Sequence, residues 1–273
     1  MNARIFVGDT RLDAIAADNR GVAYGDGLFE TMRAHRGDVP WWDAHWTRLR
    51  AGAQRLRIPM PDEAKARSEA TQLLSGEDAV LKVIVTRGSG GRGYAAVKDA
   101  APTWIVSTHP LPPGTPSEGI TVRWCETRLS VQPLLAGIKH CNRLEQVLAR
   151  AEWNDLTTQD HNAAEGLMRS TEGDVVCATA ANLLVLRNDR WHTPPVDRCG
   201  VAGVCRAWAL RELDAAESRL DVTAIEQAEA VFLCNAVRGI LPVAKLGGRE
   251  WALHPRVEAA RRRLAAAHPG FAP

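Results

Sequence analysis

The sequence predicts a mixed α+β or α/β protein with two lobes, on three observations. The chain has 273 residues, enough for one large domain or two of ordinary size. Candidate strands and helices are mixed along its length. The segment HPLPPGTPSEG, residues 109–119, contains four prolines and two glycines, and proline fixes φ and removes a backbone donor. We therefore expect an N-terminal α/β lobe over residues 1–110, an interdomain linker at 111–118 and a C-terminal lobe over 119–273.

The N-terminal lobe is expected to begin with a short strand at residues 3–7, followed by a long loop or strand over 21–37. The segment WDAHWTRLRAGAQRLRI then predicts an amphipathic helix with Asp43 as its N-cap. This helix carries apolar side chains at helical spacing: Trp46, Leu49, Ala53 and Leu56. The run AVLKVIV at 79–85 predicts a buried strand, and Pro102 opens another at 103–108.

The C-terminal lobe alternates between the two kinds of element. Apolar runs predict strands at 119–124, 182–187 and 230–234, and helical patterns lie near 143–154, 206–213 and 256–267. The arginine cluster at 261–263 is interpreted as the solvated face of the last helix.

Bulk composition excludes several classes of function. The net charge is +2, from 34 basic and 32 acidic residues, so nothing favours nucleic acid or an anionic membrane as partner. No apolar run reaches the roughly 18 residues of a membrane helix, and the first residues do not form a signal peptide. The six cysteines form no C-x-x-C pair, which argues against a zinc site or a disulfide framework. We expect a reduced, cytoplasmic protein without a metal, whose histidines, His45 and His140 included, are structural or surface groups.

The segment VTRGSGGRGYAA, residues 85–96, fits the pattern G-x-G-x-x-G at Gly88, Gly90 and Gly93. A dinucleotide fingerprint needs a helix directly after the glycines, but here about two helix-compatible turns precede the strand that Pro102 opens. That interpretation therefore fails. Two remain: a solvated hairpin tip, or an anion clamp formed by the guanidinium groups of Arg87 and Arg92.

The segment LAGIKHCNRLEQVLAR places Lys139 between a short extended stretch and a helix. Lysine is usually a surface residue. This one follows the apolar run LLAGI and has Arg143 four residues later, and both low dielectric and a nearby cation favour the neutral amine of a lysine. A neutral amine attacks carbonyl groups, so Lys139 is a candidate Schiff-base lysine.

Seven segments occur in a fixed order between residues 18 and 243: DNRGVAYGDGLFETMR, AHWTRL, TRGSGGRGY, IKHCNRLEQVLAR, ATAANLLV, GVAGVCR and LCNAVRGILPV. Together they resemble the fold-type IV pyridoxal-phosphate enzymes, which include branched-chain and D-amino-acid aminotransferases. TRGSGGRGY, KHCNRLEQ and CNAVRGILPV tilt the resemblance towards the aminodeoxychorismate lyases of that family. The resemblance implies the two-lobe, D-amino-acid aminotransferase-like architecture, with pyridoxal 5′-phosphate as cofactor and the Schiff-base lysine in the C-terminal lobe.

Residue by residue, the resemblance implies that Lys139 holds the cofactor as a Schiff base and then acts as acid and base. Arg48 is expected to pair with the cofactor phosphate. Further phosphate contacts are expected from two turns: Gly203, Val204 and Cys205 in the first, and Asn235 and Ala236 in the second.

The chain departs from the family pattern at Cys177. Most members place a glutamate there, five residues before the equivalent of Asn182, where it bonds the pyridine nitrogen. A carboxylate would hold that nitrogen protonated and deepen the electron sink, which a thiol does poorly. Cys205 likewise stands where aminotransferases often have a threonine, leaving backbone donors alone. Both changes argue against an ordinary transaminase.

The implied reaction converts 4-amino-4-deoxychorismate to p-aminobenzoate and pyruvate, a step of folate biosynthesis. This substrate is a dianion, so the resemblance favours the clamp formed by Arg87 and Arg92, with Tyr94 as a hydroxyl donor. Arg33 and Arg143 are weaker candidates for the same task.

Two other functions stay open: an aminotransferase for small, branched-chain or D-amino acids, and a non-catalytic cofactor-binding relative. The resemblance further implies a homodimer with its active site near the subunit interface. It leaves open a transient contact with aminodeoxychorismate synthase.

Overall fold

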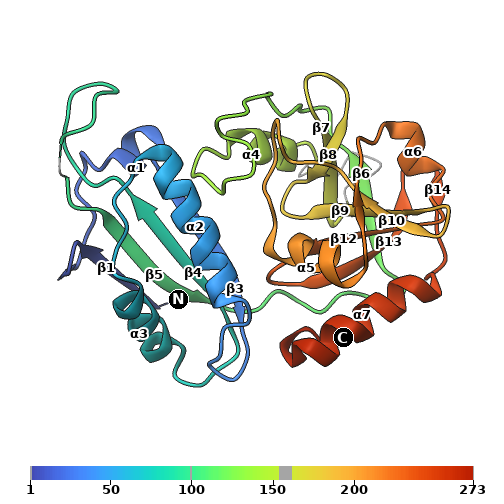
Figure 1. Cartoon of the computed structure of the whole chain (residues 1–273), viewed down its shortest axis with the longest axis horizontal. Helices are drawn as coiled ribbons and strands as arrows, with labels where there is room; N and C mark the ends of the chain where they lie inside the picture. The colour runs from blue at the N-terminus through green and yellow to red at the C-terminus, as the bar shows by residue number, and fades with distance from the viewer. Residues whose placement is uncertain (1, 99, 154–161, 273) are drawn as a thin grey trace. The chain divides into compact units, whose positions relative to one another are not determined.

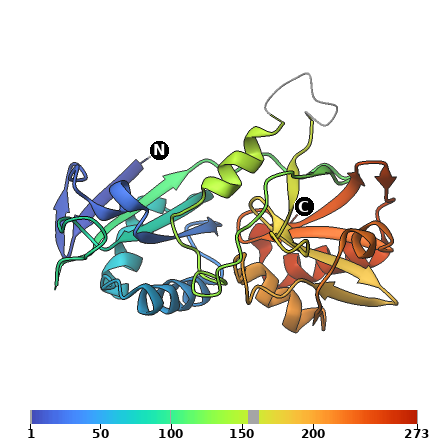
Figure 2. The ribbon, with the colours of Figure 1, turned by 90° about the horizontal axis from the view of Figure 1, so that it is seen from above.

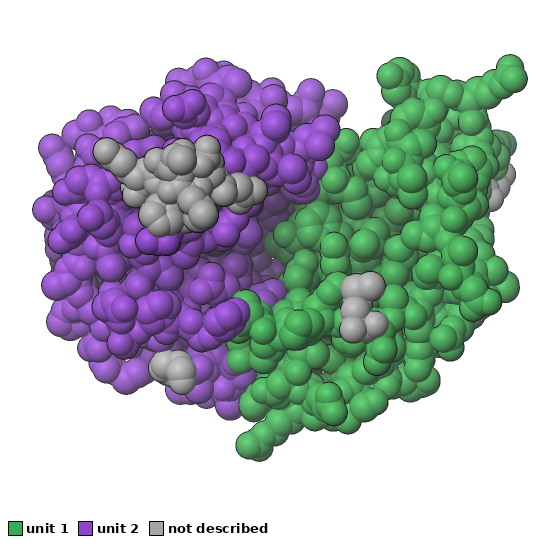
Figure 3. Space-filling model, turned by 180° about the vertical axis from the view of Figure 1, so that it is seen from behind, with its two compact units in different colours: residues 1–112, 138–142 green, residues 113–137, 143–273 purple. Residues whose placement is uncertain are grey.

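The computed structural model describes residues 2–98, 100–153 and 162–272. The chain divides into two compact units (Figure 3). Unit 1 comprises Met1–Pro112 together with Ile138–Asn142, and unit 2 comprises Pro113–Gly137 and Arg143–Pro273. The expectation that Lys139 belongs to the C-terminal lobe is therefore wrong, because the short segment that carries it returns to the N-terminal unit.

Unit 1 contains an antiparallel five-stranded sheet in the order β2-β1-β5-β4-β3 (Figure 1). Its strands are β1 (Asn2–Val7), β2 (Thr10–Leu12), β3 (Gly27–Ala34), β4 (Ala79–Thr86) and β5 (Thr103–His109). The strands expected at 3–7, 79–85 and 103–108 are confirmed within one or two residues. The segment left open as loop or strand forms the short helix α1 (Arg20–Tyr24) followed by β3.

Two longer helices pack on this sheet, α2 (Trp42–Leu56) against β3 and α3 (Glu63–Leu74) against β1, β4 and β5. The expected Asp43 N-cap of α2 is wrong. Trp41 is the N-cap residue, with φ +63° and no side-chain cap. Asp43 instead lies in the first turn, where a carboxylate interacts favourably with the helix dipole. The helix α3 was not expected; Asp62 caps it by accepting a hydrogen bond from the backbone N–H of Lys65 at 2.8 Å.

Residues 138–142 join unit 1 because β3 lies at the edge of the sheet and has backbone groups to pair. The N–H of Phe29 donates to the carbonyl of Lys139, and the N–H of Cys141 donates to the carbonyl of Gly27, each at 2.9 Å. Leu28 and His140 form the bridge between them. This pairing fixes the backbone of Lys139 against a strand that is about 110 residues away in the sequence.

Unit 2 contains a nine-stranded mixed sheet in the order β11-β10-β9-β12-β13-β6-β7-β8, with β14 paired to β13. Figure 2 shows the ribbon of this unit in colours that run from green to red. The strands are β6 (Ile120–Trp124), β7 (Glu165–Arg169), β8 (Val175–Ala178), β9 (Asn182–Arg187), β10 (Arg190–Thr193), β11 (Ala216–Glu217), β12 (Ala230–Asn235), β13 (Gly239–Leu246) and β14 (Arg249–Glu250). The strands expected at 119–124, 182–187 and 230–234 correspond to β6, β9 and β12. A core of buried aliphatic side chains from β6, β7, β9, β12 and β13 holds these strands together.

The helices of unit 2 are α4 (Leu144–Ala151), α5 (Val204–Glu212), α6 (Val222–Glu226), α7 (Pro255–Ala267) and the 3₁₀ turn η1 (Pro269–Phe271). The expected helices near 143–154, 206–213 and 256–267 correspond to α4, α5 and α7. Residue 154, the last of the first expected helix, lies outside the described residues. Among the residues that the structure describes, no helix is both long and apolar enough to cross a membrane.

Candidate active site

Lys139 lies partly buried at the edge of β3. Its Nζ atom is 4.4 Å from the centroid of the Phe29 ring. Phe29 faces it from the adjacent strand, so backbone pairing and a ring contact both hold the amine in one place. A positioned amine beside an apolar ring is what a carbonyl-attacking lysine requires.

A buried charge network lies in the same unit. Glu30 and His45 are each 1% exposed, and Glu30 Oε2 is 2.7 Å from His45 Nδ1. Arg48 pairs with both oxygens of Glu30, its Nε donating to Oε1 at 2.8 Å and its terminal nitrogen to Oε2. Glu30 lies on β3, and His45 and Arg48 lie on α2, so the network also joins the helix to the sheet.

The pKa values of this network follow from burial and charge. Burial alone would raise the pKa of Glu30, but the charge of Arg48 and the hydrogen bond from His45 outweigh it and lower the pKa to about 2. Burial lowers the pKa of His45, against the opposing effect of Glu30, and the charges of Arg48 and Lys139 lower it further. Glu30 is thus an anion and His45 a neutral ring at pH 7, and the Glu30 carboxylate is ion-paired with Arg48.

Unit 2 contains the predicted phosphate turn at the start of α5. Gly203 is the N-cap residue, and it offers no side-chain acceptor to the first-turn N–H groups of Val204 and Cys205. A Cβ at Gly203 would lie 1.9 Å from Oδ1 of Asn182, so glycine is required by close approach. Asn182 also donates to the carbonyl of Val201 at 2.9 Å. The open N–H groups fit a phosphate.

The thiol of Cys205 turns away from these N–H groups. It is 1% exposed, and its hydrogen bond with Cys234 of β12, together with burial, raises its pKa well above the usual value. As expected for a cysteine in place of a threonine, the backbone alone remains to bind an anion at this position. The same contact brings the start of α5 beside the end of β12.

Asn235, at the end of β12, builds the second predicted turn. Its Oδ1 accepts hydrogen bonds from the N–H groups of Val237 at 3.0 Å and Arg238 at 2.8 Å, and its Nδ2 donates to the carbonyl of Ala180 at 3.2 Å. The side chain therefore shapes the turn that contains Ala236, and also fixes it to the loop before β9.

Cys177, on β8, lies in a cluster of apolar and thiol side chains: Cys125, Leu129, Ala149, Trp153, Ala163, Met168, Val176 and Cys199. Burial raises the pKa of the Cys177 thiol to about 12. The carboxyl of Glu165, on the neighbouring strand, accepts a hydrogen bond from the hydroxyl of Thr179. A pyridine nitrogen at Cys177 would therefore meet a neutral thiol, and Glu165 is already engaged.

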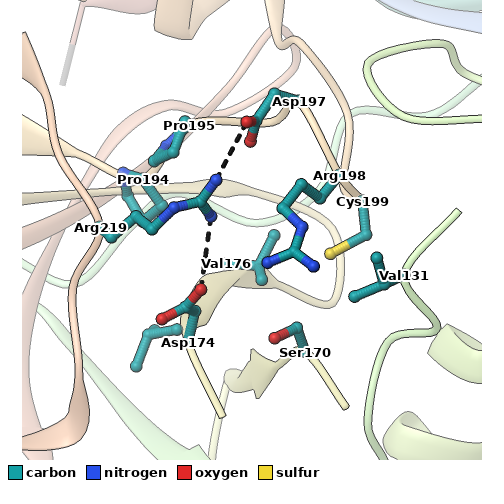
Figure 4. Close-up of a pocket in the computed structure, with 11 residues that line it drawn as sticks. Val131, Ser170, Asp174, Val176, Pro194, Pro195, Asp197, Arg198, Cys199 and Arg219 are labelled. Atoms are coloured by element: carbon teal, nitrogen blue, oxygen red, sulfur yellow. Dashed lines mark hydrogen bonds and ion pairs between the residues drawn. The ribbon is translucent and has the colours of Figure 1, made fainter. Parts of the chain in front are cut away.

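The loop that leads to Gly203 is anchored by Arg219 (Figure 4). Its guanidinium donates to Asp174 at 3.3 Å and to Asp197 at 3.0 Å across a small hollow. Arg198, also at its rim, pairs with Glu172. All five charged groups are paired within unit 2, so the hollow is interpreted as part of the scaffold that fixes the phosphate turn.

The two arginines predicted to form a clamp have different surroundings. Arg87 directly precedes the glycine loop, residues 88–95, and Arg92 lies within it. Arg87 is held by unit 1 itself: it donates to both oxygens of Asp26 at 2.7 and 3.0 Å and to the carbonyls of Leu56 and Arg57 at 2.8 and 2.6 Å. Arg92 is exposed and bonds to none of the described residues, and Tyr94 is 90% exposed. The structure therefore makes Arg92 and Tyr94 the groups available to a ligand, whereas Arg87 supports the loop.

The two weaker candidates lie in different units. Arg33 is on β3, on the same face as Phe29 because side chains alternate along a strand, and burial lowers its pKa. Arg143 is the N-cap residue of α4 in unit 2. Of the predicted residues, unit 1 thus holds Lys139, Arg48, Arg33 and the glycine loop, and unit 2 holds Cys177, both phosphate turns and Arg143.

Sequence reasoning did not assign a place beside the predicted site residues to four others: Arg20, Asp26, Glu30 and His45, of which His45 was expected only to be a structural or surface group. A signal existed for Glu30, since alternation along LFETM places it on the same face as the apolar Leu28 and Met32. One also existed for His45, which is one turn before Arg48 on α2. The role of Arg20 depends on contacts with a loop 70 residues later, which no local pattern records.

Comparison with known proteins places this geometry in a family. Aminodeoxychorismate lyase of Vibrio harveyi is 34% identical over 241 residues, covering 85% of this chain and 87% of that protein. The crystal structure of 4-amino-4-deoxychorismate lyase from Pseudomonas aeruginosa is 38% identical with a TM-score of 0.88, and the match covers 97% of this chain and 99% of the other. The branched-chain amino acid aminotransferase of Escherichia coli, at 17% identity and a TM-score of 0.85 over 99% of this chain and 96% of the other, shares the fold.

These likenesses confirm the expected fold-type IV class. The family model for amino-transferase class IV matches residues 27–246, a range that runs from β3 to the end of β13 and includes both Lys139 and the two phosphate turns. The chain therefore belongs to the amino-transferase class IV family.

Proposed function

We propose that this protein is a pyridoxal-phosphate-dependent lyase that converts 4-amino-4-deoxychorismate to p-aminobenzoate and pyruvate. The observation that carries the proposal is the placement of Lys139, whose backbone is paired to β3 and whose Nζ atom lies over the Phe29 ring near the Glu30–His45–Arg48 network. The similarity of this chain to two aminodeoxychorismate lyases over most of its length supports the choice of substrate.

The cofactor is pyridoxal 5′-phosphate, and each unit by itself contains donors of a kind that suits it. Lys139 supplies the amine for its aldehyde. In unit 1, Arg48 is a cation suited to its phosphate. In unit 2, the backbone groups at Gly203–Cys205 and Ala236 are N–H donors suited to a phosphate. When bound, the cofactor supplies an electron sink that weakens the C4–H bond of the substrate ring.

Lys139 then moves one proton. Its amine removes the proton at ring carbon C4, and the bond from the neighbouring ring carbon to the enolpyruvyl oxygen breaks. The ring becomes aromatic as p-aminobenzoate, and the released enolate takes up one proton at its terminal carbon to become pyruvate. The glycine loop presents the exposed Arg92 and Tyr94 as partners for the substrate carboxylates.

An aminotransferase that acts on small, branched-chain or D-amino acids is the alternative within this family. It calls for a deep electron sink, and the neutral thiol at Cys177 does not provide a carboxylate for the ring nitrogen. Aromatisation of the product supplies much of the driving force of the lyase reaction, so a weaker electron sink suffices.

The test is to reduce the holoenzyme with borohydride and map the modified peptide by mass spectrometry. We expect a pyridoxyl adduct on Lys139 and none on Lys82, whose Nζ lies 5.4 Å from the same Phe29 ring. In parallel, release of pyruvate and p-aminobenzoate from aminodeoxychorismate is compared with formation of oxo acids from amino acids. An adduct elsewhere, or oxo acids as the main product, would overturn the proposal.

We also infer that the protein acts as a homodimer in the cytoplasm. Three large apolar side chains on one side of α4 are exposed: Leu144 at 75%, and Val147 and Leu148 at 60% each. Exposed apolar stripes of this kind mark protein interfaces.

All six cysteines are free thiols, which suits a reducing compartment. The product p-aminobenzoate would enter folate biosynthesis.

A further inference from the structure

The short helix α1 is locked onto the ends of β4 and β5. Asn19, which is 1% exposed, donates to the hydroxyl of Thr103 at 3.0 Å and accepts from the hydroxyl of Thr86 at 3.1 Å. A Cβ at Gly21 would lie 2.2 Å from a methyl of Thr86. Because helix and strand are in such close contact, the first residue of α1, Arg20, stands on a rigid base.

Arg20 extends from this base into the glycine loop. Its side chain is 5% exposed, and its terminal nitrogens donate to three consecutive carbonyls: Gly93 at 3.2 Å, Tyr94 at 3.1 Å and Ala95 at 3.3 Å. Its backbone N–H donates to the carbonyl of Gly88 at 2.8 Å. The loop thus wraps around a single guanidinium, with its carbonyls turned inward.

The glycines of the loop make this wrapping possible. Gly88, Gly90, Gly91 and Gly93 all have positive φ, between +56° and +100°, a region that residues with a Cβ rarely adopt. A Cβ at Gly91 would also lie 2.5 Å from the carbonyl of Ala95 and 3.3 Å from a nitrogen of Arg20. The close approach that the glycines permit is therefore to an arginine of the chain itself.

Asp26 completes the arrangement by pairing with two arginines. It accepts from Arg20 Nε at 2.9 Å and, as described above, from two nitrogens of Arg87. Arg20 thereby links residues 93–95, at the far end of the loop, to the Asp26 carboxylate, which also holds Arg87 directly before the loop. Both ends of the loop therefore depend on the guanidinium groups of Arg20 and Arg87.

The side chains of the loop point outward as a result. Tyr94, although its carbonyl is held by Arg20, leaves its ring exposed, with its edge on Tyr24 at 5.7 Å between centroids. The guanidinium of Arg20 lies 4.9 Å from the centroid of Tyr24. Arg92, directly before the gripped carbonyls, is exposed.

We infer that Arg20 is a positioning residue for substrate binding, which holds the loop of residues 88–95 so that Arg92 and Tyr94 meet the substrate carboxylates. The part about substrate rests on the proposed function, whereas the grip on the loop does not. The first test therefore measures the loop alone. Trypsin cleaves after exposed arginines, and the bond after Arg92 is exposed in a loop that Arg20 holds closed.

In Arg20→Met we expect cleavage after Arg92 to be at least about fivefold faster than in the wild type, because local opening is what protease cleavage reports. Arg11→Met, a change at an exposed arginine of β2, should leave that rate unchanged. Equal rates in Arg20→Met and the wild type would overturn the inference whether or not the protein is a lyase.

The second test uses the holoenzyme with 4-amino-4-deoxychorismate. Arg20→Met is expected to raise KM about tenfold, with kcat within about twofold and an unchanged absorbance band of the bound cofactor. A parallel fall in kcat and loss of the band would indicate a general structural role and reject the inference. A wild type that makes no p-aminobenzoate would refute the proposed function while leaving the cleavage result to decide the grip.

Arg20→Lys is a second variant, which tests the inference if Arg20→Met does not fold. Lysine can still pair with Asp26, but it cannot serve three carbonyls and a carboxylate together. We expect intermediate cleavage and a KM raised about threefold. Wild-type values of both in Arg20→Lys would show that the carbonyl contacts do not position the loop.

Discussion

Oε2 of Glu30 lies 2.7 Å from Nδ1 of His45, and both side chains are 1% exposed. Arg48 pairs with the same carboxylate from the solvent side, where it is 13% exposed. The Glu30 carboxylate thus fixes Arg48, the cation expected to bind the cofactor phosphate. Glu30 directly follows Phe29 on β3, and the Phe29 ring contacts Lys139.

Glu30→Gln should therefore weaken both stability and cofactor binding. Removing one member of a buried charged network leaves the others uncompensated, and we expect the free energy of unfolding to fall by about 3 kcal/mol. The dissociation constant of pyridoxal phosphate should rise at least about tenfold, because Arg48 loses the group that orients it. Denaturant unfolding and a fluorescence titration of the apoenzyme measure the two effects. Glu77→Gln, at an exposed carboxyl of the same unit, should change neither.

The same carboxylate predicts how stability responds to acid. The pKa of Glu30 is lowered to about 2 in the folded protein, from an ordinary value of 4.5. Its contribution is therefore complete above about pH 4.5 and is lost as the pH falls towards 2, at up to about 1.4 kcal/mol per pH unit. Urea unfolding of wild type and Glu30→Gln between pH 7 and 3 should show the gap between them narrowing below about pH 4.5. A gap that stays constant would contradict the assignment.

Arg87 and Arg92 should behave differently when each is replaced by alanine. Arg92→Ala is expected to raise KM for aminodeoxychorismate at least about tenfold without changing stability, because the side chain is exposed and forms no hydrogen bond or ion pair with a described residue. Arg87→Ala should lower the free energy of unfolding by about 2 kcal/mol, because it removes one of the two arginines that pair with Asp26 and leaves the carbonyls of Leu56 and Arg57 without this donor. Thermal unfolding and steady-state kinetics on both variants separate the two roles. If Arg92→Ala keeps a normal KM, the loop is a solvated hairpin.

Local pattern was sufficient for part of the fold, whereas β7, β8, β10, β13, α3 and α6 were not predicted. The apolar runs of β4 and β5 and the 3.6-residue period of α2 reflect interactions between neighbours in sequence, so their positions could be predicted within one or two residues. The short strands β2, β11 and β14 escaped prediction because two or three residues carry no periodicity. The predicted Asp43 cap failed because Trp41 adopts a left-handed conformation that its residue type does not suggest.

The site was less accessible to sequence because its contacts are long in range. Residues 138–142 follow the Pro-rich linker, yet they pair with β3, and no pattern within the segment specifies that partner. Arg87 and Arg92 are both arginines next to glycines in one short segment, and the sequence alone does not distinguish their surroundings. Only the carboxylate of Asp26 and the end of α2, brought together by folding, bind Arg87 within unit 1, whereas Arg92 stays exposed.

The proposed homodimer can be tested at the exposed apolar stripe on α4. Leu148→Asp places a charge in the middle of the exposed set formed with Leu144 and Val147, and burying an unpaired carboxylate is costly. We expect the dissociation constant of the dimer to rise at least about a hundredfold, measured by analytical ultracentrifugation. Leu12→Asp, at a residue of β2 that is 40% exposed, is the matched control and should remain a dimer. Two variants with equal assembly would place the interface elsewhere.

Cys177→Glu should change the partition between elimination and transamination. Cys177 is buried with Met168, Leu129 and Cys199, and its thiol is neutral because burial raises its pKa to about 12. A glutamate there would be anionic only if a protonated ring nitrogen paired with it, and that pair would deepen the electron sink of the cofactor. We expect more oxo acid relative to p-aminobenzoate, measured by chromatography of both products from matched amounts of enzyme. Cys177→Ser, which keeps a small neutral side chain, should leave the ratio at the wild-type value. An unchanged ratio in Cys177→Glu, in a variant that still binds the cofactor, would mean that position 177 does not control the ring nitrogen.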